Sequence, residues 1–307
     1  MSFKTIKNTY ILGLGALGGM YASQLQDMNP EAVKIIADEK RIKSYQNTAF
    51  TVNGKSRTFQ YVRPETGAPY ADLIMVTVKF NALPNAIKDL KSFVGPDTII
   101  ISLLNGIGSE ELIGNTIGID HLIHAYGVGM DAVREGTALT YSNMGKIVFG
   151  EKIPGAAPAK ITALKDLFDR AAIPCVNPEN MERAMWTKFM LNVGINQAST
   201  ILNAPYGAFQ SPSEARELMK MASREVIQLS LKCGIDLNED DLKNCLNIIE
   251  TLHPNGKTSM LQDMEAGRKT EVDIFAGAVM DLGKKYHIPT PVNETFYRII
   301  RFMEEIQ

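Results

Sequence analysis

Three polar side chains recur at four-residue intervals within an otherwise apolar stretch, residues 183–202. Lys188, Asn192 and Asn196 would lie along one face of a helix, because residues four apart are neighbours on its surface. Burying a lysine and two amides without partners is costly, so they either pair with other protein groups or line a site for a polar ligand. In the second case Lys188 is the candidate for chemistry, since an ammonium can protonate or stabilise an oxygen that turns negative when a ketone is reduced.

A second polar series occurs later in the chain, at Ser259, Asp263, Gly267 and Glu271, again at intervals of four. We predict a single helix over residues 259–286, on which Asp263 and Glu271 would be roughly 12 Å apart at 1.5 Å per residue. Taken alone, the two acids favour an ordinary solvent-facing surface, because other charged residues flank them.

The two series together favour a substrate cleft over two unrelated surfaces. Asn192, Asn196 and Ser259 would hold a carboxylate or hydroxyl group of the substrate, and Lys188 would supply a cation and a proton donor. The methionines in both stretches are more typical of core packing than of binding.

A glycine-rich hexapeptide near the N-terminus has the spacing of a dinucleotide-binding loop. It follows a predicted strand directly and opens a predicted helix, and it consists of Gly13, Leu14, Gly15, Ala16, Leu17 and Gly18. The first glycine permits a tight turn, the second lets a pyrophosphate approach the backbone, and the third lets helix and strand pack closely. The N-terminus of the helix attracts the anion. We therefore predict nucleotide binding here, the alternative being a tight turn in a glycine-rich loop.

The residues that would choose between NAD and NADP are ambiguous. Asp38 and Glu39 follow the second predicted strand, and an acid there binds the ribose hydroxyl of NAD. Lys40 and Arg41 come next, and a basic group there favours the additional phosphate of NADP. All four also fit the exposed, charged start of a helix. The sequence pattern leaves the choice of coenzyme open.

Two further polar residues stand at the ends of predicted strands. Lys79 follows the strand predicted at residues 73–78, and Asn105 follows the strand predicted at residues 98–103. Ligands of open α/β sheets bind at the carboxyl ends of the strands, so both residues are predicted to meet the cofactor or the substrate. For Asn105 the alternative is an ordinary turn, because it precedes a glycine.

The elements that must position these residues change character halfway along the chain. In the first half, short apolar runs alternate with helical stretches, which predicts an open, doubly wound sheet. The predicted strands are residues 8–12, 33–37, 73–78, 98–103 and 121–128, the helices residues 20–28 and 82–93, and the hairpins residues 50–52 with 57–62 and 137–141 with 146–149.

The second half contains only helical patterns, separated by proline or glycine. The predicted helices are residues 178–203, 213–233, 239–252, 259–286 and 291–305. We therefore predict an α/β protein with an N-terminal Rossmann-type dinucleotide-binding domain, residues 1–177, followed by an all-helical C-terminal substrate and catalytic domain, residues 178–307.

The composition argues against several classes of protein. The 307 residues are 45% hydrophobic and 21% charged, as in folded globular proteins. A net charge of −2 without a dense basic cluster argues against a nucleic-acid partner, and no apolar run is long enough to predict a membrane span. Three cysteines without metal-type spacing predict reduced thiols, no metal site and a cytoplasmic location.

Taken in order, these motifs make the chain resemble the ketopantoate reductase (2-dehydropantoate 2-reductase) family. The resemblance runs nearly from end to end and includes GLGALG, the VK pair that ends at Lys79, and LNGIG around Asn105. Its most specific parts are WTKFMLNVGINQAST, residues 186–200, and KTSMLQDMEAGRKTEVD, residues 257–273.

The resemblance implies a role for each residue of the two polar series. In that family the lysine at the position of Lys188 is the general acid that protonates the 2-oxo group as the nicotinamide delivers hydride. The residues at the positions of Asn192, Asn196 and Ser259 contact the substrate. The acid at the position of Asp263 shapes the closed site.

The resemblance also implies the cofactor contacts. The acid at the position of Glu271 shapes the closed site and touches the cofactor, while residues at the positions of Lys79, Asn105 and the backbone of Ala132 lie along it. The usual coenzyme of the family is NADPH, and the product is pantoate, on the way to pantothenate and coenzyme A.

The chain departs from the family pattern at two positions. Tyr206 stands where some members place another substrate-binding asparagine, which bears on the identity of the substrate. Asp38 occupies a strand end where an enzyme with a firm preference for NADP would avoid an acid.

The leading hypothesis is an NADPH-dependent reductase of ketopantoate, a small-molecule 2-oxo acid, with NADH as the alternative coenzyme. One rival is a family-related reductase of another 2-oxo acid. A second is a β-hydroxyacid dehydrogenase, against which the SMLQD run argues. A rival from another class is a non-catalytic NAD(P)H-binding sensor. No motif specifies the oligomeric state, so a homodimer stays open.

Overall fold

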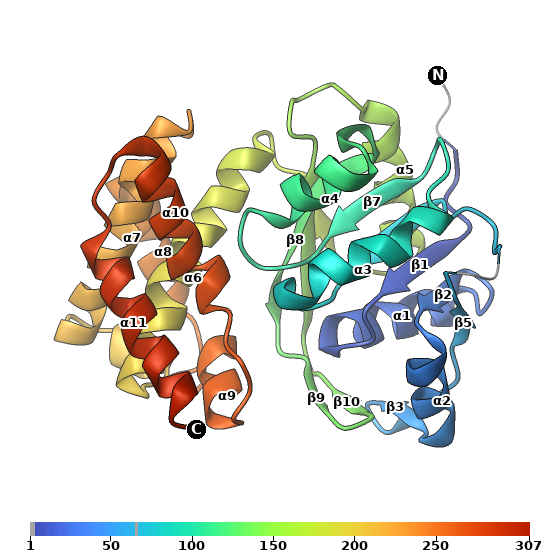
Figure 1. Cartoon of the computed structure of the whole chain (residues 1–307), viewed down its shortest axis with the longest axis horizontal. Helices are drawn as coiled ribbons and strands as arrows, with labels where there is room; N and C mark the ends of the chain where they lie inside the picture. The colour runs from blue at the N-terminus through green and yellow to red at the C-terminus, as the bar shows by residue number, and fades with distance from the viewer. Residues whose placement is uncertain (1–3, 65–66) are drawn as a thin grey trace. The chain divides into compact units, whose positions relative to one another are not determined.

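The protein divides into two compact units in a computed structural model that describes residues 4–64 and 67–307. The first unit comprises Met1–Asn105 and Ser109–Met181, and the second comprises Gly106–Gly108 and Glu182–Gln307. The first is an α/β structure and the second is built of helices (Figure 1). The fold class is the one predicted from the sequence.

An eight-stranded sheet forms the centre of the first unit, in the order β12-β11-β8-β7-β6-β1-β2-β5. The strands from β5 to β8 in this order run parallel, whereas β11 is antiparallel to β8 and β12 is parallel to β11. The strands are β1 (Thr9–Leu12), β2 (Val33–Ile36), β5 (Gln60–Val62), β6 (Leu73–Val76), β7 (Ile99–Ser102), β8 (Leu122–Met130), β11 (Met144–Gly150) and β12 (Cys175–Val176).

Helices cover both faces of this sheet, and alternate residues of each strand point to opposite faces. Ile11 and Met75 belong to an apolar cluster with residues of α1 (Ala16–Met28) and α5 (Pro158–Arg170). Tyr10 and Ile74 belong to a second cluster with residues of α3 (Leu83–Leu90) and α4 (Ser109–Ile117). All residues of β1, β6 and β7 are buried, which explains their continuous runs of apolar residues.

The first predicted hairpin forms at its Asn53-Gly54 turn but is shorter than predicted, whereas the second is wrong in its pairing. The second half of the first hairpin separates into β4 (Lys55–Arg57), which does pair with β3 (Phe50–Val52), and β5, which joins the large sheet beside β2. The strands of the second hairpin do not pair with each other. β10 (Ala138–Thr140) pairs with β3 and β9 (Val133–Glu135), while β11 pairs with β8.

The turn before β11 shows why the second hairpin does not form. The carboxylate of Asp131 accepts backbone N–H groups of Ser142 and Asn143 at 2.9 and 2.8 Å, which ties this segment to the end of β8. Residues 147–150 are all buried. The continuous apolar pattern of such a strand predicts that it is buried but not which strand it pairs with. The local pattern therefore identified the strands but not their partners.

The second unit contains six α-helices in its described residues. They are α6 (Met181–Leu202), α7 (Glu214–Lys232), α8 (Glu239–Glu250), α9 (Ser259–Glu265), α10 (Ala276–Tyr286) and α11 (Pro291–Glu305). The single helix predicted over residues 259–286 is wrong, because the chain turns after α9. Gly267 adopts a positive φ of 63°, and the Arg268 N–H donates to the Asp263 carbonyl at 2.8 Å. Glu271 consequently lies outside α9, and the 12 Å spacing predicted for a continuous helix does not apply.

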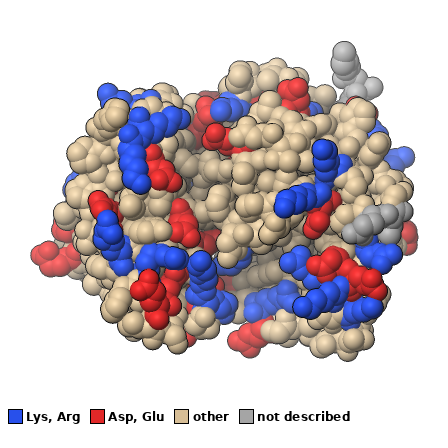
Figure 2. Space-filling view, viewed as in Figure 1, with Lys and Arg blue, Asp and Glu red and all other residues tan. Residues whose placement is uncertain are grey.

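Across the described ranges, no helix has both the length and the apolar character needed to cross a membrane. On the face drawn in Figure 2, acidic and basic side chains are interspersed. Cys175, Cys233 and Cys245 are free thiols, and burial raises the pKa of Cys245 to about 12.

A buried histidine makes the stability of the first unit depend on pH. His124 on β8 is only 9% exposed, and its Nδ1 has no hydrogen-bond partner in the described structure. Burial, reinforced by the charge of Lys152, lowers the pKa of His124 from 6.5 to about 4. Above pH 6.5 the ring is neutral in both folded and unfolded chains, but between pH 6.5 and 4 only the unfolded chain takes up a proton. The free energy of unfolding must therefore fall as the pH falls through this window.

We expect the substitution His124→Leu to remove this acid sensitivity. Between pH 7.5 and pH 5 the wild-type protein should lose about 2 kcal/mol of unfolding free energy through His124, at 1.36 kcal/mol per pH unit. Urea denaturation at both pH values measures the loss, with the exposed His253→Gln as the control. An equal acid loss in wild type and His124→Leu would contradict the assignment.

Candidate active site

The glycines of the predicted dinucleotide loop have three different steric environments, which match their predicted roles. Gly13 has a φ of 108°, and a Cβ there would lie 2.9 Å from the backbone of Thr77. A Cβ on Gly18 would lie 1.9 Å from the Gly13 carbonyl oxygen. A Cβ on Gly15 would meet nothing within 4 Å. Gly13 and Gly18 therefore serve the packing of strand and helix, whereas Gly15 leaves space open beside the loop.

The start of α1 fits an anionic ligand. Gly15 is its N-cap residue, and no side chain within the described residues caps the N-terminal N–H groups of the helix. These N–H groups and the helix dipole favour a negative charge at this end. The loop lies between β1 and its neighbours β2 and β6, where the connections leave the sheet in opposite directions, which is the usual place for a dinucleotide.

The other predicted cofactor residues follow neighbouring strands of the same sheet. Lys79 follows β6 and is the N-cap of a short 3-10 helix, Phe80–Ala82. Asn105 follows β7, and Ala132 follows β8. Because β1, β6 and β7 are parallel and end in register, Lys79 and Asn105 lie at the same sheet edge as the glycine loop. β8 continues beyond this edge to Met130, and Ala132 follows there.

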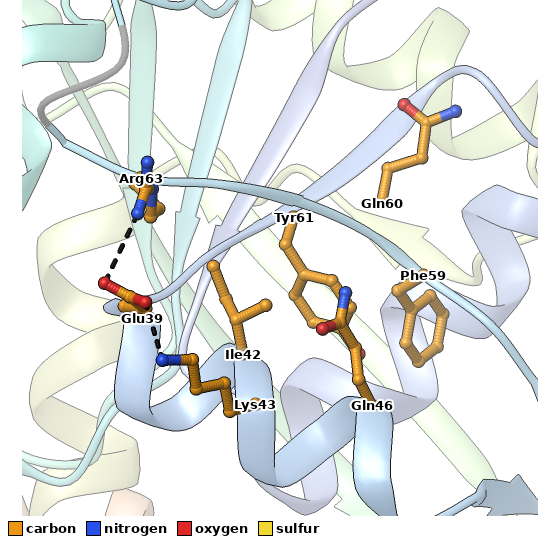
Figure 3. Close-up of a pocket in the computed structure, with 8 residues that line it drawn as sticks. All are labelled: Glu39, Ile42, Lys43, Gln46, Phe59, Gln60, Tyr61 and Arg63. Carbon is orange, nitrogen blue, oxygen red and sulfur yellow. Dashed lines mark ion pairs between the residues drawn. The ribbon is translucent and has the colours of Figure 1, made fainter.

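The end of β2, where the sequence predicts the coenzyme ribose, carries mixed charges. Asp38 is the N-cap of α2 (Glu39–Asn47), where its carboxylate accepts the Arg41 N–H at 2.7 Å. Glu39 forms ion pairs with Lys43 at 2.7 Å and with Arg63 at 3.5 Å (Figure 3). These three residues line one end of a cavity of about 620 Å³ between α2 and β5. The structure thus gives Asp38 a capping role and places two cations beside an acid.

In the second unit, two contacts fix the rotation of α6 about its axis. Gly194 lets α7 approach so closely that a Cβ there would lie 2.3 Å from Ser223 Oγ. Gln197 Nε2 donates to Asn293 Oδ1 at 3.0 Å, and Gln197 Oε1 accepts the Ala276 N–H at 3.1 Å, which joins α6 to α11 and α10. These contacts bury the opposite side of α6 and so fix the direction in which the face with Lys188, Asn192 and Asn196 points.

The first polar series has the geometry predicted for it. α6 is continuous over Met181–Leu202, so Lys188, Asn192 and Asn196 lie on one face. Lys188 and Asn192 are half-buried, whereas Asn196 is 6% exposed. Asn196 Oδ1 accepts the Ser259 hydroxyl at 3.3 Å and the Met260 N–H at 3.4 Å. The fold therefore joins Asn196 to Ser259, two predicted substrate ligands that are 63 residues apart.

The two acids of the second series occupy different environments. The Asp263 side chain is 7% exposed, and its carboxylate accepts Arg268 Nε at 2.8 Å. This ion pair stabilises the turn that ends α9. Glu271 is half-buried and precedes the short 3-10 helix Val272–Ile274.

Two residues beside the glycine loop, Thr77 and Arg134, were not singled out from the sequence. The Thr77 hydroxyl donates to the Gly13 carbonyl at 2.6 Å, and Arg134 donates to the Leu14 carbonyl. Tyr206, noted from the sequence, is half-buried, and burial raises the pKa of its hydroxyl. A polar residue at the end of a buried strand was a signal for Thr77. Nothing local in the sequence indicated Arg134, because its partner is 120 residues away.

Within residues 4–64 and 67–307, no group of three or more His, Cys, Asp and Glu side chains could hold a metal ion. The fold and the glycine loop define a nucleotide-binding protein, and an ammonium flanked by amides on α6 is suited to carbonyl reduction. The class these features define is an oxidoreductase that uses a nicotinamide cofactor.

Comparison with known families gives the class a name. Residues 9–153 match the family model described as "Ketopantoate reductase PanE/ApbA", and residues 180–304 match "Ketopantoate reductase PanE/ApbA C terminal". The two matches cover most of the chain, in order. The chain therefore belongs to the ketopantoate reductase family.

Individual relatives span the same length but are distant in sequence. A 2-dehydropantoate 2-reductase of Pyrococcus horikoshii is 25% identical over 299 residues, 97% of each chain. A solved D-mandelate dehydrogenase, in a ternary structure with NADH and anilino(oxo)acetate, superposes with a TM-score of 0.86 at 20% identity, over 97% of this chain and 98% of that one. The dimeric ketopantoate reductase of Staphylococcus aureus superposes with a TM-score of 0.81 at 21% identity, over 97% and 99%. At these identities the solved structures establish the fold.

Proposed function

We propose that the protein reduces 2-dehydropantoate to pantoate with NADPH and that Lys188 is the general acid. The observation that carries this proposal is the α6 face, on which an ammonium and two amides stand together and Asn196 contacts Ser259. The family membership supplies the substrate, because relatives over 97% of the chain carry that activity in their names.

When bound, a nicotinamide coenzyme would supply the hydride that the carbonyl carbon of the substrate receives. Lys188 Nζ donates its proton to the carbonyl oxygen, so the product leaves as an alcohol and the lysine is left neutral. Asn192, Asn196 and Ser259 hold the carboxylate and hydroxyl groups of the oxo acid. Asp263, fixed by Arg268, would shape the α9 turn. The family resemblance gives Glu271 the role of closing the site and contacting the coenzyme.

The residues of the first unit that would hold the coenzyme are those at the sheet edge. The N–H groups at the start of α1 would receive the pyrophosphate, with Gly15 leaving room for it. Lys79, Asn105 and the backbone of Ala132 would contact the remainder of the dinucleotide.

We expect the substitution Asp38→Asn to shift coenzyme use toward NADPH. Asparagine caps a helix as well as aspartate does, so α2 should be retained while one negative charge beside the ribose is lost. The ratio of kcat/KM for NADPH to that for NADH should rise by roughly two- to fivefold, the effect of an exposed charge pair. Asp97→Asn, an exposed position in the same unit, is the control. An unchanged ratio would show that Asp38 does not face the coenzyme phosphate.

A second candidate function is reduction of another 2-oxo acid, and Tyr206 favours it. A half-buried tyrosine ring offers an apolar surface where some family members have an asparagine, which would suit a substrate with a larger apolar side chain. The superposed D-mandelate dehydrogenase shows that the same fold also occurs in an enzyme named for an acid other than pantoate.

An assay with a panel of 2-oxo acids distinguishes the candidates. The panel contains ketopantoate, 2-oxoisovalerate and phenylglyoxylate, each with NADPH and with NADH, followed by the absorbance of the reduced coenzyme. The proposal requires the largest kcat/KM for ketopantoate with NADPH. A larger value for another acid favours the second candidate, and coenzyme binding without consumption on any acid would identify a sensor.

We further propose that the enzyme is a homodimer in the cytoplasm. The name of the Staphylococcus aureus protein records a dimer. In this chain α11 exposes the apolar side chains Ile299 and Phe302, and Ile306 directly after the helix is also exposed. The three cysteines remain free thiols, as in reducing compartments. Light scattering of the purified protein tests the dimer, and fractionation tests the location.

A further inference from the structure

The small four-stranded sheet, in the order β4-β3-β10-β9, carries an arginine that reaches the dinucleotide loop. Arg134 on β9 donates through Nη1 to the Leu14 carbonyl and through Nε to the Gly136 carbonyl at 2.8 Å. Its guanidinium lies over the ring of Phe50 at 5.5 Å and over that of Tyr45 at 6.0 Å. Two rings and two carbonyls therefore hold the guanidinium in one orientation.

The Leu14 carbonyl belongs to the peptide that also carries the Gly15 N–H. In a planar trans peptide the C=O and N–H bonds point in opposite directions, so fixing the Leu14 oxygen also fixes the direction of the Gly15 N–H. That N–H points away from Arg134.

Without Arg134, little would resist rotation of this peptide. Gly15 has no side chain, and the space around its Cα on the side of a Cβ is open to 4 Å. The preceding carbonyl, of Gly13, is already held by the Thr77 hydroxyl at 2.6 Å. A ligand would need the open space beside Gly15. The same open space leaves the Leu14–Gly15 peptide without neighbouring atoms that would restrain its rotation.

We propose that Arg134 is a positioning residue for the coenzyme: it holds the Leu14–Gly15 peptide so that the Gly15 N–H faces the pyrophosphate. The small sheet then contributes to coenzyme affinity through one side chain. This inference rests on the use of a dinucleotide coenzyme and does not depend on which oxo acid is reduced.

The first test measures NADPH binding by its fluorescence in wild type, Arg134→Met and Arg134→Lys. A hydrogen bond from a charged donor has the strength to change affinity by roughly tenfold or more, so the Kd of Arg134→Met should rise by at least roughly tenfold. Its KM for NADPH should change more than its kcat. Arg134→Lys, which can still donate to the Leu14 carbonyl, should recover part of the affinity.

The second test observes the ligand-free protein. Nitrogen-15 relaxation dispersion at the Gly15 amide should be flat in wild type and show microsecond-to-millisecond exchange in Arg134→Met. Because neither the binding nor the NMR measurement contains an oxo acid, failure of the proposed substrate would leave both results intact.

The control is Arg57→Met, in the same small sheet. Arg57 on β4 binds Asp27 of α1 at 2.5 and 2.7 Å but does not contact the loop, so its loss weakens the attachment of the sheet without releasing Leu14. The Kd for NADPH and the Gly15 dispersion should remain as in wild type. Equal effects of Arg57→Met and Arg134→Met, or an unchanged Gly15 amide in Arg134→Met, would overturn the proposal.

Discussion

Lys188→Ala should lower kcat for oxo-acid reduction by roughly 10²–10⁴-fold, the usual contribution of a general acid. Hydride arrival at the carbonyl carbon leaves negative charge on the oxygen, and on the α6 face Lys188 is the cation of the polar series. NADPH affinity should stay close to that of wild type, because the loop proposed to bind the coenzyme belongs to the other unit. The exposed Lys243→Ala is the matched control and should keep full turnover.

Lys188→Arg separates proton donation from charge stabilisation. Arginine keeps a positive charge but does not release its proton at working pH, so it should rescue little of the lost rate if Lys188 is the acid. Strong rescue would indicate that charge alone is needed. In the wild type, reduction should also slow at alkaline pH, since only the ammonium can donate. A pH–rate profile that stays flat through the alkaline range, or near-normal turnover of Lys188→Ala, would contradict the assignment of Lys188 as the general acid.

The residues that the sequence located best are those set by local periodicity. The spacing of Lys188, Asn192 and Asn196 requires only that one helix be continuous, and α6 is continuous across all three. The same reasoning failed for Glu271, because the turn at Gly267 interrupts the helix that was assumed to carry it. A glycine inside a helical pattern is compatible with either outcome, and the Arg268–Asp263 contacts that favour the turn become apparent only in the structure.

The contacts between distant segments could not be predicted in the same way. Asn196 with Ser259, and Arg134 with Leu14, depend on packing between elements separated by 63 and 120 residues. Hydrophobic patterns predict that such elements are buried but not which neighbours they meet, as the pairing of β5 with β2 and of β11 with β8 also shows. The fold class was predictable because it follows from the order of elements along the chain, an alternating first half and a helical second half. Side-chain partners depend instead on the tertiary structure.

The glycine loop provides the second large expected effect, since Gly18→Ala and Gly15→Ala should fail in opposite ways. A Cβ on Gly18 would lie 1.9 Å from the Gly13 carbonyl oxygen and 2.6 Å from Thr77 Oγ1, so strand and helix must separate. Overpacking against backbone costs about 3 kcal/mol or more, and this variant should unfold at lower urea concentration and lose NADPH binding.

Gly15→Ala should instead keep the fold and lose the ligand. With φ of −84° and ψ of −159°, Gly15 has a backbone conformation that alanine also adopts, and the added Cβ meets no protein atom within 4 Å. Its urea midpoint should match that of wild type, while its Kd for NADPH rises by at least roughly tenfold because the methyl group occupies the space left for the pyrophosphate. The pair therefore distinguishes a glycine that serves packing from one that serves binding. Normal NADPH affinity in Gly15→Ala would show that the coenzyme does not approach the loop at this residue, and normal stability in Gly18→Ala would show that strand and helix are less tightly packed than the structure indicates.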